Sequence, residues 1–585
     1  MNAQRFWCAL GTGAGVALIL AGCATEGSVR QARAEAEKAA TESSQVLAAT
    51  RAAAAQRQIA DRALQARLAR LESEQLELLQ GVRHMQALSI RGQAPATGGK
   101  HRALAATTKI ELNGVFTQVT AQARALAGAP YKAPPAISPE LQRLNFTDYG
   151  KLKLLGRVPG WPTGTPFHIQ LFPAGYLFTW PVKIAVVAGG KTWPAQLPIT
   201  VTGDPGLAKR IPNPVPQAGF SAYTPFGQGP SVNQFLSFLG ASYFRAVGQG
   251  QSWGLSARGI AIDTALPHRA EEFPYFRAFW IVASHPHARH FTFCALLDSP
   301  SLTGAYRFVV RPGRQTVVDV KAVLFERKQV RRLGIAPLTS MFLQGRFSHH
   351  RFDQLLRSAH DSDGLAIAMP GNTRLWWPLR NPRRIAIYRF ALTNPQGFGL
   401  MQRARRAGDY RAFGMHYEDR PSAWVTPEGN WGPGHLVLIE LPTDSQTNDN
   451  ISVFWVPDNQ GARLQPLTFR YRIAWQGQNP KGSHLGYVIA GRHAYNANSH
   501  SETYVVDFAG QALAAAVPAS VAPFVRVFGP ARVVSAWATR EATGDWRLQF
   551  DLARTGSDAV TIHAALMQGP TRVTETWAGV LPTAQ

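Results

Sequence analysis

Carboxylates close to tryptophans are the residues of this sequence that are best suited to chemistry. Asp361 and Asp363 lie in the segment 360–364, and Asp449 lies in the segment 447–450, between two strand-like runs. Paired carboxylates suit cleavage of a glycosidic bond, with one as general acid and the other as general base. Indole faces stack on the apolar faces of sugar rings. The same region of the chain contains Trp376, Trp377, Trp424, Trp431 and Trp455.

The same residues also have a purely structural interpretation. Both aspartate segments are ordinary turn sequences, and β-sandwich cores use tryptophan freely. Other chemistries find less support: the histidines of the segment 285–290 lack a cysteine or carboxylate that would complete a metal site. Serine-containing turns lack the Gly-x-Ser-x-Gly pattern of a nucleophile elbow. The sequence predicts no metal, no cofactor and no serine hydrolase.

The N-terminus predicts export from the cytoplasm. Arg5 precedes a short apolar run over 9–20, and small residues follow before Cys23. This arrangement is typical of a secretory signal rather than of a spanning helix. The segment 20–23, Leu-Ala-Gly-Cys, resembles a bacterial lipobox, in which the cysteine becomes the acylated N-terminus. We expect a signal peptide over 1–22, lipidation of Cys23 and, because Ala24 follows, an outer-membrane anchor. An ordinary signal with a chance cysteine is the alternative.

The net charge bears on which partners the protein could bind, and the cysteine content bears on disulfides. The net charge of +25 could attract nucleic acid, anionic lipid or an acidic polysaccharide, although an arginine-rich composition alone would explain it equally well. No base-reading motif occurs, so we expect no nucleic-acid partner. Cys294 is the only cysteine left after the signal and the lipidated Cys23, and it lies in an apolar run. We therefore predict a buried thiol and no intramolecular disulfide.

Two kinds of segment must position these groups. Residues 27–90 are rich in Ala, Gln, Glu, Arg and Leu without proline, and Leu64, Leu68, Leu71, Leu78, Val82 and Met85 have coiled-coil spacing. This predicts a helical stalk, within 23–104, that reaches roughly 90 to 100 Å at about 1.5 Å per residue. A partly ordered spacer is the alternative. The stalk would also allow oligomerisation.

From about residue 105 the sequence changes to short apolar runs bounded by turn residues. Runs over 181–187, 306–310 and 435–440 predict strands of an all-β sandwich body, with one early helix over 116–126. A polar stretch near 476–500 predicts a domain junction. The alternating runs beyond it predict a small immunoglobulin-like sandwich.

Several motifs make a family resemblance recognisable. In order along about 105–585, the chain resembles the periplasmic glucan biosynthesis proteins OpgG and OpgD (MdoG and MdoD). The matching segments are 241–245 (Ala-Ser-Tyr-Phe-Arg), 254–259, 261–265, 271–274, 296–300, 303–306, 336–342, 394–400, 420–425 and 448–451. The signal, lipobox and stalk lie outside the resemblance.

The resemblance implies a fold and a function. It implies a galactose-mutarotase-like β-sandwich over 105–478, an immunoglobulin-like domain over 488–585, and a role in making osmoregulated periplasmic glucan with a β-1,2-linked backbone. Family members are similar to inverting endo-β-1,2-glucanases. By motif, the general acid falls on Asp449, the general base on Asp361 and a water-relay tyrosine on Tyr417. We expect Trp376, Trp377, Arg420, Trp424 and Trp431 to bind the glucan.

Departures from the family pattern leave a second function open. Gln446 stands where family members commonly have Glu, and Ser358 stands in place of a Glu expected from the family. In the segment 372–378, where the family has Gly-Glu-Trp-x-Trp-Arg-Pro, Thr373 and Arg374 replace the Glu and the first Trp. The alternative is a non-catalytic glucan-binding or scaffolding partner of the membrane glucan synthase. A third interpretation is a basic body that docks on anionic envelope polymers.

Overall fold

The described part of the chain is one all-β body. The computed structural model describes residues 101–226, 232–345, 357–410, 414–460, 463–477, 484–497, 500–514 and 516–583. These residues belong to one compact unit, Gln93–Gln585. The predicted signal peptide, Cys23 and nearly all of the predicted stalk lie outside the described residues. Within the described ranges, no helix is both long enough and apolar enough to cross a membrane.

The predicted strands are present, which confirms the all-β prediction. The apolar runs over 181–187, 306–310 and 435–440 fall in β3 (Lys183–Ala188), β13 (Leu302–Arg311) and β23 (Pro433–Glu440). Cys294 lies in β12 (Phe291–Asp298) and is fully buried, as predicted. Strand β12 is buried at every residue, and a strand covered on both faces reads as a continuous apolar run.

Two large sheets build the body. The first has ten strands. Its order is β2 (His168–Pro173), β6 (Gln217–Thr224), β7 (Asn233–Leu239), β8 (Tyr243–Ala246), β9 (Ser256–Arg258), β15 (Leu333–Ser340), β24 (Ile451–Pro457), β23 and β20 (Ala386–Thr393), with β10 (Ala261–Ile262) paired to β15.

The second sheet has fifteen strands. Its order is β28 (Val521–Phe528), β31 (Val560–Gln568), β33 (Thr576–Leu581), β19 (Thr373–Pro378), β18 (Gly364–Met369), β21 (Gly397–Met401), β22 (Ser422–Glu428), β25 (Leu467–Gln476), β14 (Thr316–Glu326), β13, β12, β11 (Tyr275–Val282), β3 and β4 (Lys191–Pro194), with β32 (Thr571–Arg572) beside β31.

Phenylalanines fill much of the space between the two sheets. Phe238 of the first sheet packs edge-on against Phe293 of the second, with ring centroids 5.2 Å apart and planes at 84°. Phe220 meets Phe279 in the same manner at 5.1 Å. Edge-to-face pairs of this kind add to the free energy gained by burying the rings. The core therefore fixes the two sheets against each other.

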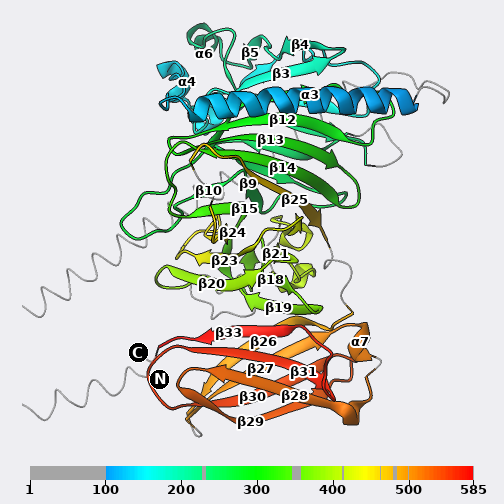
Figure 1. Ribbon diagram of the computed structural model, residues 1–585, viewed down its shortest axis with the longest axis vertical. Coiled ribbons are helices and arrows are strands. Elements are labelled where there is room, and N and C mark those ends of the chain that lie inside the picture. Colours follow the sequence, from blue (N-terminus) through cyan, green and yellow to red (C-terminus); the bar gives the residue numbers. More distant parts are fainter. Residues whose placement is uncertain are drawn as a thin grey trace, which may run out of the picture. The chain divides into compact units, whose positions relative to one another are not determined.

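One long helix covers the outer face of the second sheet. Helix α3 (His101–Ala127) runs across β12, β13 and β14 (Figure 1). Its buried side chains, Leu112, Val115, Phe116, Val119, Ala123 and Ala127, have the spacing of one helix face. The helix predicted over 116–126 is thus confirmed, and it begins earlier than expected.

Short elements complete the edges of the body. They are α4 (Pro139–Gln142), α5 (Phe146–Gly150), β1 (Leu152–Leu154), β5 (Ile199–Val201), α6 (Pro205–Arg210), β16 (Phe342–Gln344), β17 (Ala359–His360), η2 (Ala407–Asp409), η3 (Tyr417–Asp419), α7 (Gln511–Ala514) and η4 (Pro518–Ser520). Strand β16 pairs with β17, and β1 pairs with β5.

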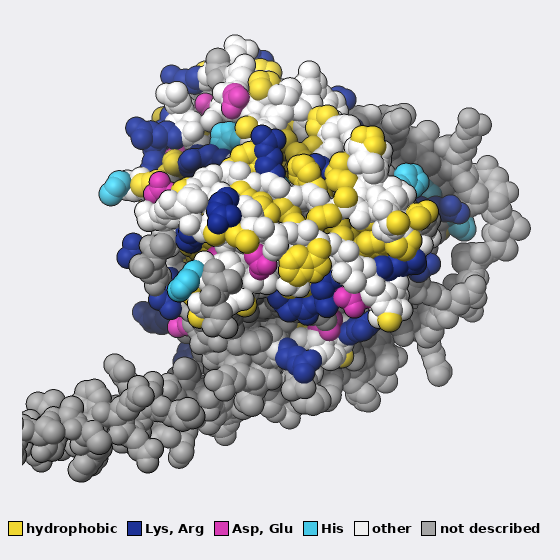
Figure 2. Space-filling view, turned by 90° about the horizontal axis from the view of Figure 1, so that it is seen from below, with side chains coloured by type: hydrophobic (Ala, Val, Ile, Leu, Met, Phe, Trp, Pro, Cys, Tyr) yellow, Lys and Arg dark blue, Asp and Glu magenta, His cyan; other side chains and the backbone are white. Residues whose placement is uncertain are grey.

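The C-terminal strands form a second sandwich. A four-stranded sheet of β26 (Tyr487–Asn496), β27 (Ser501–Ala509), β30 (Trp546–Arg554) and β29 (Ala531–Arg540) shares a core with β28, β31 and β33. Figure 2 shows the face of the molecule on which β28, β29 and β30 lie. Strand β33 pairs in parallel with β19, so the fifteen-stranded sheet continues across the predicted junction near 476–500.

A buried ion pair reinforces this continuity. Arg403 donates to both carboxylate oxygens of Glu575, one at 3.0 Å, and Glu575 is 2% exposed. The Arg403 guanidinium also lies 3.6 Å from the ring centre of Trp376. Removal of either charged partner would leave the other buried without its counter-charge, which is costly, so the pair joins the C-terminal sandwich to the rest of the body.

The buried carboxyl of Glu440, at the end of β23, predicts how stability depends on pH. Its Oε1 accepts from the backbone N–H of Arg380 at 3.0 Å, and burial raises its pKa from the ordinary 4.5 to about 8. The folded protein therefore holds a proton that the unfolded chain releases above pH 4.5, and stability falls as pH rises from about 4.5 to about 8.

Glu440→Gln should remove this part of the pH dependence. We expect the variant to be more stable than the parent at pH 9, and the difference to shrink below pH 5. Urea denaturation at both values measures it. An unchanged slope of stability against pH would contradict the assignment.

Candidate active site

Asp361 forms the most buried ion pair of the candidate site. It follows β17, and its backbone N–H donates to the carbonyl of Met341 at 2.8 Å. Its Oδ1 accepts from the guanidinium of Arg420, whose side chain is 15% exposed against 7% for Asp361. Burial raises the pKa of the Asp361 carboxyl, and the contact with Arg420 opposes that shift. The contact favours the carboxylate form.

Asp449 has a more open environment. Its side chain is 30% exposed, and its Oδ2 lies 3.5 Å from the guanidinium of Arg245 on β8. Burial among the surrounding protein atoms raises the pKa of Asp449 above its ordinary value, and Arg245 and then Arg420 oppose the shift. The charge of Asp449 raises the pKa of Asp361, and Arg245 and Arg420 lower the pKa of both carboxyls. The structure thus brings the two predicted aspartates together.

A turn over 415–420 carries Tyr417 and Arg420. His416 adopts left-handed backbone angles (φ 48°) and begins the turn η3. The Tyr417 hydroxyl donates to Gln446 Oε1 at 2.6 Å. Arg420 lies over the Tyr417 ring, 4.1 Å from its centre. The departure at Gln446 therefore touches the predicted relay tyrosine directly, and Arg420 serves Asp361 rather than standing open to a ligand.

Amide side chains hold the loops that bring these residues together. Gln402 donates from Nε2 to the carbonyls of His360 and Tyr417, at 2.9 and 3.0 Å. Asn450 donates to the carbonyls of Phe342 and Leu441 and accepts from the N–H of Phe342. Gln402 thus joins the Asp361 segment to the Tyr417 turn, and Asn450 fixes the residue next to Asp449.

Asp363 belongs to the structural framework. Its Oδ2 accepts from the backbone N–H groups of Arg403 and Ala404, each at 3.0 Å. Burial raises the pKa of Asp363, and Arg403 opposes the shift. The carboxylates of the resemblance motifs are likewise engaged: Glu271 with Arg258, Glu272 with Ser301, and Asp298 with Arg277 and Arg327.

The predicted substrate-binding tryptophans lie in cores, which corrects the stacking role expected for them. Trp376 is 0% exposed and Trp424 is 7% exposed, and both belong to the core shared with the C-terminal sandwich. Trp377 and Trp431 belong to the main core, at 5% and 6%. Such burial leaves no open indole face for a sugar. The departure Arg374 lies over Trp424, 5.7 Å from its ring centre.

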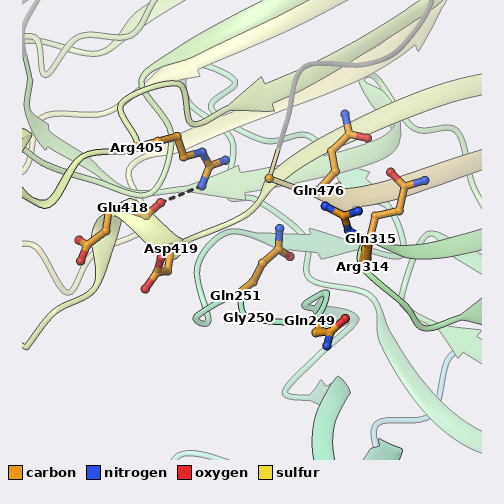
Figure 3. A pocket seen from close by; sticks show the side chains of 10 residues that line it. Gln249, Gly250, Gln251, Arg314, Gln315, Arg405, Glu418, Asp419 and Gln476 are labelled. Carbon is orange, nitrogen blue, oxygen red and sulfur yellow. Dashed lines mark hydrogen bonds between the residues drawn. The ribbon is translucent and has the colours of Figure 1, made fainter. Parts of the chain in front are cut away.

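A polar cavity lies beside the same turn. It has a volume of about 950 Å³, within the usual size of ligand sites. Figure 3 shows glutamine side chains around it from the loop 249–251, the turn before β14 and the end of β25, and Arg405 donates to the Glu418 carbonyl at 3.1 Å. Its lining residues are Gln249, Gly250, Gln251, Arg314, Gln315, Arg405, Glu418, Asp419, Gln476 and Gly477. Amides that both donate and accept suit the hydroxyls of a neutral sugar.

One group of potential metal ligands occurs among the described residues. His416, Glu418 and Asp419 lie close together, with His416 Nδ1 at 3.7 and 3.6 Å from the two carboxylates. His416 and Asp419 are exposed, and exposed groups of this kind are common without a metal. Glu418 and Asp419 of this group also line the polar cavity.

Two residues of the candidate site could not be placed from the sequence. Arg245 lies in the motif 241–245, which carried the resemblance, but nothing in the spacing placed it beside Asp449. Gln402 has no motif around it, and its role follows from contacts over 42 and 15 residues of chain. The motif was the available signal for Arg245.

The match to a family model assigns the class. Residues 115–580 match the model described as periplasmic glucan biosynthesis protein, MdoG. This match covers well over half of the chain, so the protein belongs to this family, which confirms the resemblance. At the level of the family, its role is in periplasmic glucan biosynthesis.

Named relatives agree with this class. The chain is 39% identical over 483 residues to "Glucans biosynthesis protein G" of Ralstonia nicotianae, a match that covers 80% of this chain and 96% of the relative. It is 39% identical over 472 residues to the protein of the same name from Pseudomonas putida, covering 77% and 84%. The protein of that name from Shewanella putrefaciens is 37% identical over 468 residues, covering 78% and 84%.

The two ion pairs of the site predict different effects on stability. Arg420→Met leaves Asp361 buried without its partner and should lower the free energy of unfolding by about 3 to 5 kcal/mol. Arg245→Met removes a more exposed pair and should cost about 1 kcal/mol or less. Urea denaturation of both variants at pH 7 makes the comparison. Equal losses of unfolding free energy in the two variants would contradict the distinction between the buried pair of Asp361 with Arg420 and the more exposed pair of Asp449 with Arg245.

Proposed function

We propose that this protein is an inverting endo-β-1,2-glucanase that trims or shapes the backbone of osmoregulated periplasmic glucan. The observation that carries the proposal is the convergence of Asp361 and Asp449 in unlike environments. Burial raises the pKa of both carboxyls, but Asp361 is buried against Arg420, whose contact opposes the shift, whereas Asp449 is partly open beside Arg245. Two carboxyls with different environments are the requirement for an acid and a base in one site.

Asp449 suits the general acid. Its raised pKa favours the protonated form, and its partial exposure lets a substrate reach it. In the proposed step Asp449 donates its proton to the glycosidic oxygen that leaves. The bond from this oxygen to the anomeric carbon breaks as a water attacks that carbon from the opposite face.

Asp361 suits the general base. Contact with Arg420 favours its carboxylate, which can receive the proton of the attacking water. The proton passes to Asp361 through water, and the Tyr417 hydroxyl, which donates to Gln446 Oε1, can accept a hydrogen bond from that water and hold it in place. A water chain would allow a longer separation than the roughly 6.5 to 9.5 Å between carboxyls of ordinary inverting enzymes. The products carry an inverted, α-configured reducing end.

The polar cavity would hold part of the glucan. It shares the turn 417–420 with the proposed catalytic residues, and glutamine amides line it. A neutral chain of hydroxyls needs donors and acceptors rather than a field of one sign, which this lining supplies. With the tryptophans buried, hydrogen bonds rather than indole stacking would dominate recognition here.

A test compares three variants of the acidic residues. Asp449→Asn and Asp361→Asn should each lower the release of new reducing ends from linear β-1,2-glucan by about a hundredfold to ten-thousandfold, the usual contribution of acid–base catalysis. Asp444→Asn changes an exposed carboxyl in the Asp449 loop and should retain activity. Full activity of the first two variants would overturn the assignment.

The position of Arg245 beside Asp449 predicts how kcat/KM depends on pH. Its charge lowers the pKa of Asp449, so Arg245→Gln should raise that pKa and keep the acid protonated to higher pH. The alkaline limb of kcat/KM against pH should therefore move to higher pH, and more than the acidic limb, because Arg245 contacts Asp449. Arg143→Gln, an exposed change after α4, serves as control. A shift to lower pH would contradict the roles.

A non-catalytic partner of the membrane glucan synthase is the second candidate. The observation that favours it is the tie between Tyr417 and Gln446, where the family pattern has an acidic residue. Binding of β-1,2-glucan without new reducing ends would support this candidate over the hydrolase. Retained binding by Asp449→Asn would then be expected as well.

The location of the protein completes the proposal. We place it in the periplasm, with Cys23 as lipid anchor to the outer membrane and the helical stalk as spacer and oligomerisation arm. The lipobox and the coiled-coil spacing support this arrangement. Retention of radiolabelled palmitate by the parent and its loss in Cys23→Ala would test the anchor.

A further inference from the structure

Phe273 is an exposed aromatic residue that a buried arginine holds in place. Its side chain is 43% exposed, and it lies in the segment 271–274, one of the motifs that carry the family resemblance. The guanidinium of Arg258 lies over its ring, 5.0 Å from the centre. A single exposed apolar residue is ordinary on a protein surface. A ring that a buried charge fixes in position is not, and it points to a role for the ring.

Arg258 has oxygen acceptors for only part of its guanidinium. It is 3% exposed, and its Nη1 donates to Glu271 Oε1 at 2.7 Å, an oxygen that also accepts from the Thr264 hydroxyl at 2.9 Å. Its Nε and Nη2 have no hydrogen-bond partner among the described residues. The guanidinium lies over the ring of Tyr243, at 5.1 Å, as well as over that of Phe273. Because the faces of aromatic rings attract cations, the two rings take the place of the missing acceptors.

This arrangement adjoins Asp449. Tyr243 pairs with Arg258 across β8 and β9, and Arg245 follows Tyr243 by two residues, on the same face of β8. The guanidinium of Arg245 lies 3.5 Å from Asp449 Oδ2. Burial raises the pKa of the Tyr243 hydroxyl, Arg258 opposes the shift, and the charge of Asp449 adds to it. The exposed ring of Phe273 is therefore connected to Asp449 through Arg258 and Tyr243.

An open aromatic face is what the candidate site needs for a sugar. Among the described residues, the tryptophans expected to stack on the glucan lie in cores, and Tyr417 is fully buried. Aromatic faces stack on the apolar faces of sugar rings. A ring that is already held in one position loses little conformational freedom when a ligand stacks on it. Phe273 therefore meets the requirement that the buried tryptophans do not.

We propose that Phe273 stacks on a glucose unit of the glucan on the Asp449 side of the site, and that Arg258 positions its ring. This inference rests on the proposed function and adds to it a residue that sets the affinity for the chain. Since two residues separate Phe273 from Asp449, the ring meets a glucose unit away from the cleaved bond. The contact is then equally strong in the ground state and the transition state, so Phe273 controls KM rather than kcat.

Calorimetric titration with linear β-1,2-glucan tests the proposal in an Asp449→Asn background, in which cleavage does not interfere. Phe273→Ala should weaken the dissociation constant about tenfold or more, as truncation of an aromatic anchor does, and Phe273→Trp should retain affinity. Phe528→Ala is the matched control, because Phe528 is 42% exposed on β28 with Arg526 over its ring at 4.9 Å. It should leave affinity unchanged. Unchanged affinity of Phe273→Ala would show that the ring only covers Arg258, and would overturn the proposal.

Kinetics of Phe273→Ala in the parent separate this inference from the proposed function. The variant should raise KM about tenfold and keep kcat within about twofold, with thermal unfolding nearly unchanged because the ring is exposed. A fall in kcat at unchanged KM would show that the substitution disturbs Asp449, and would overturn the stacking role. Absence of cleavage by the parent would contradict the proposed hydrolase, whereas the titration would still decide the role of Phe273.

A double-mutant cycle tests the positioning role of Arg258. Arg258→Lys keeps a positive charge beside Glu271 but lacks the planar guanidinium that lies over both rings. It should weaken glucan binding less than Phe273→Ala does, and combining the two substitutions should add nothing to the loss from Phe273→Ala alone. Additive losses would show that Arg258 acts independently of the ring, and would overturn its positioning role.

Discussion

The ion pair between Asp361 and Arg420 is the interaction on which the candidate site depends. A buried carboxylate is costly unless it is paired, and Arg420 supplies the pair from a turn 59 residues further along the chain. The same guanidinium lies over Tyr417 and donates to the carbonyl of Met415. One charged contact therefore closes the Tyr417 turn over the segment that carries Asp361.

The surrounding contacts hold the Asp361 side of the candidate site rigid and leave the Asp449 side accessible. Gln402 and Asn450 tie the loops through bonds to backbone carbonyls, and the phenylalanine core holds the two sheets that present those loops. Asp449, by contrast, meets Arg245 in a partly exposed pair. Burial raises the pKa of both carboxyls, and the asymmetry that acid–base chemistry needs lies in their partners: Arg420 closely opposes the shift at the buried Asp361, whereas Asp449 is accessible.

The sequence predicted the elements better than the contacts between them. Strands such as β12 were predictable because burial on both faces leaves an unbroken apolar run, and the inner face of α3 was predictable from its spacing. The tryptophans were misread because an indole suits a sugar and a core equally well, and only the tertiary fold decides. The continuous sheet across the 476–500 junction depends on the pairing of β33 with β19, strands about 200 residues apart, for which no local pattern exists.

The candidate site, too, could be predicted from the sequence only in part. Residue types alone suggested carboxylate chemistry but could not choose between Asp361 and Asp363, and the family resemblance made that choice. Asp363 proves to be bound by backbone N–H groups, whereas Asp361 shares a charged cluster with Asp449. Arg245 escaped notice because its partner lies 204 residues away in sequence, across a sheet.

The anomeric configuration of the first products tests the central claim most directly. Proton NMR during the first minutes of incubation with linear β-1,2-glucan distinguishes the configuration of new reducing ends before they equilibrate. If Asp449 and Asp361 act as acid and base on opposite faces of the sugar, α-configured ends appear first and the β signal grows later. Initial formation of β-configured ends would contradict the account.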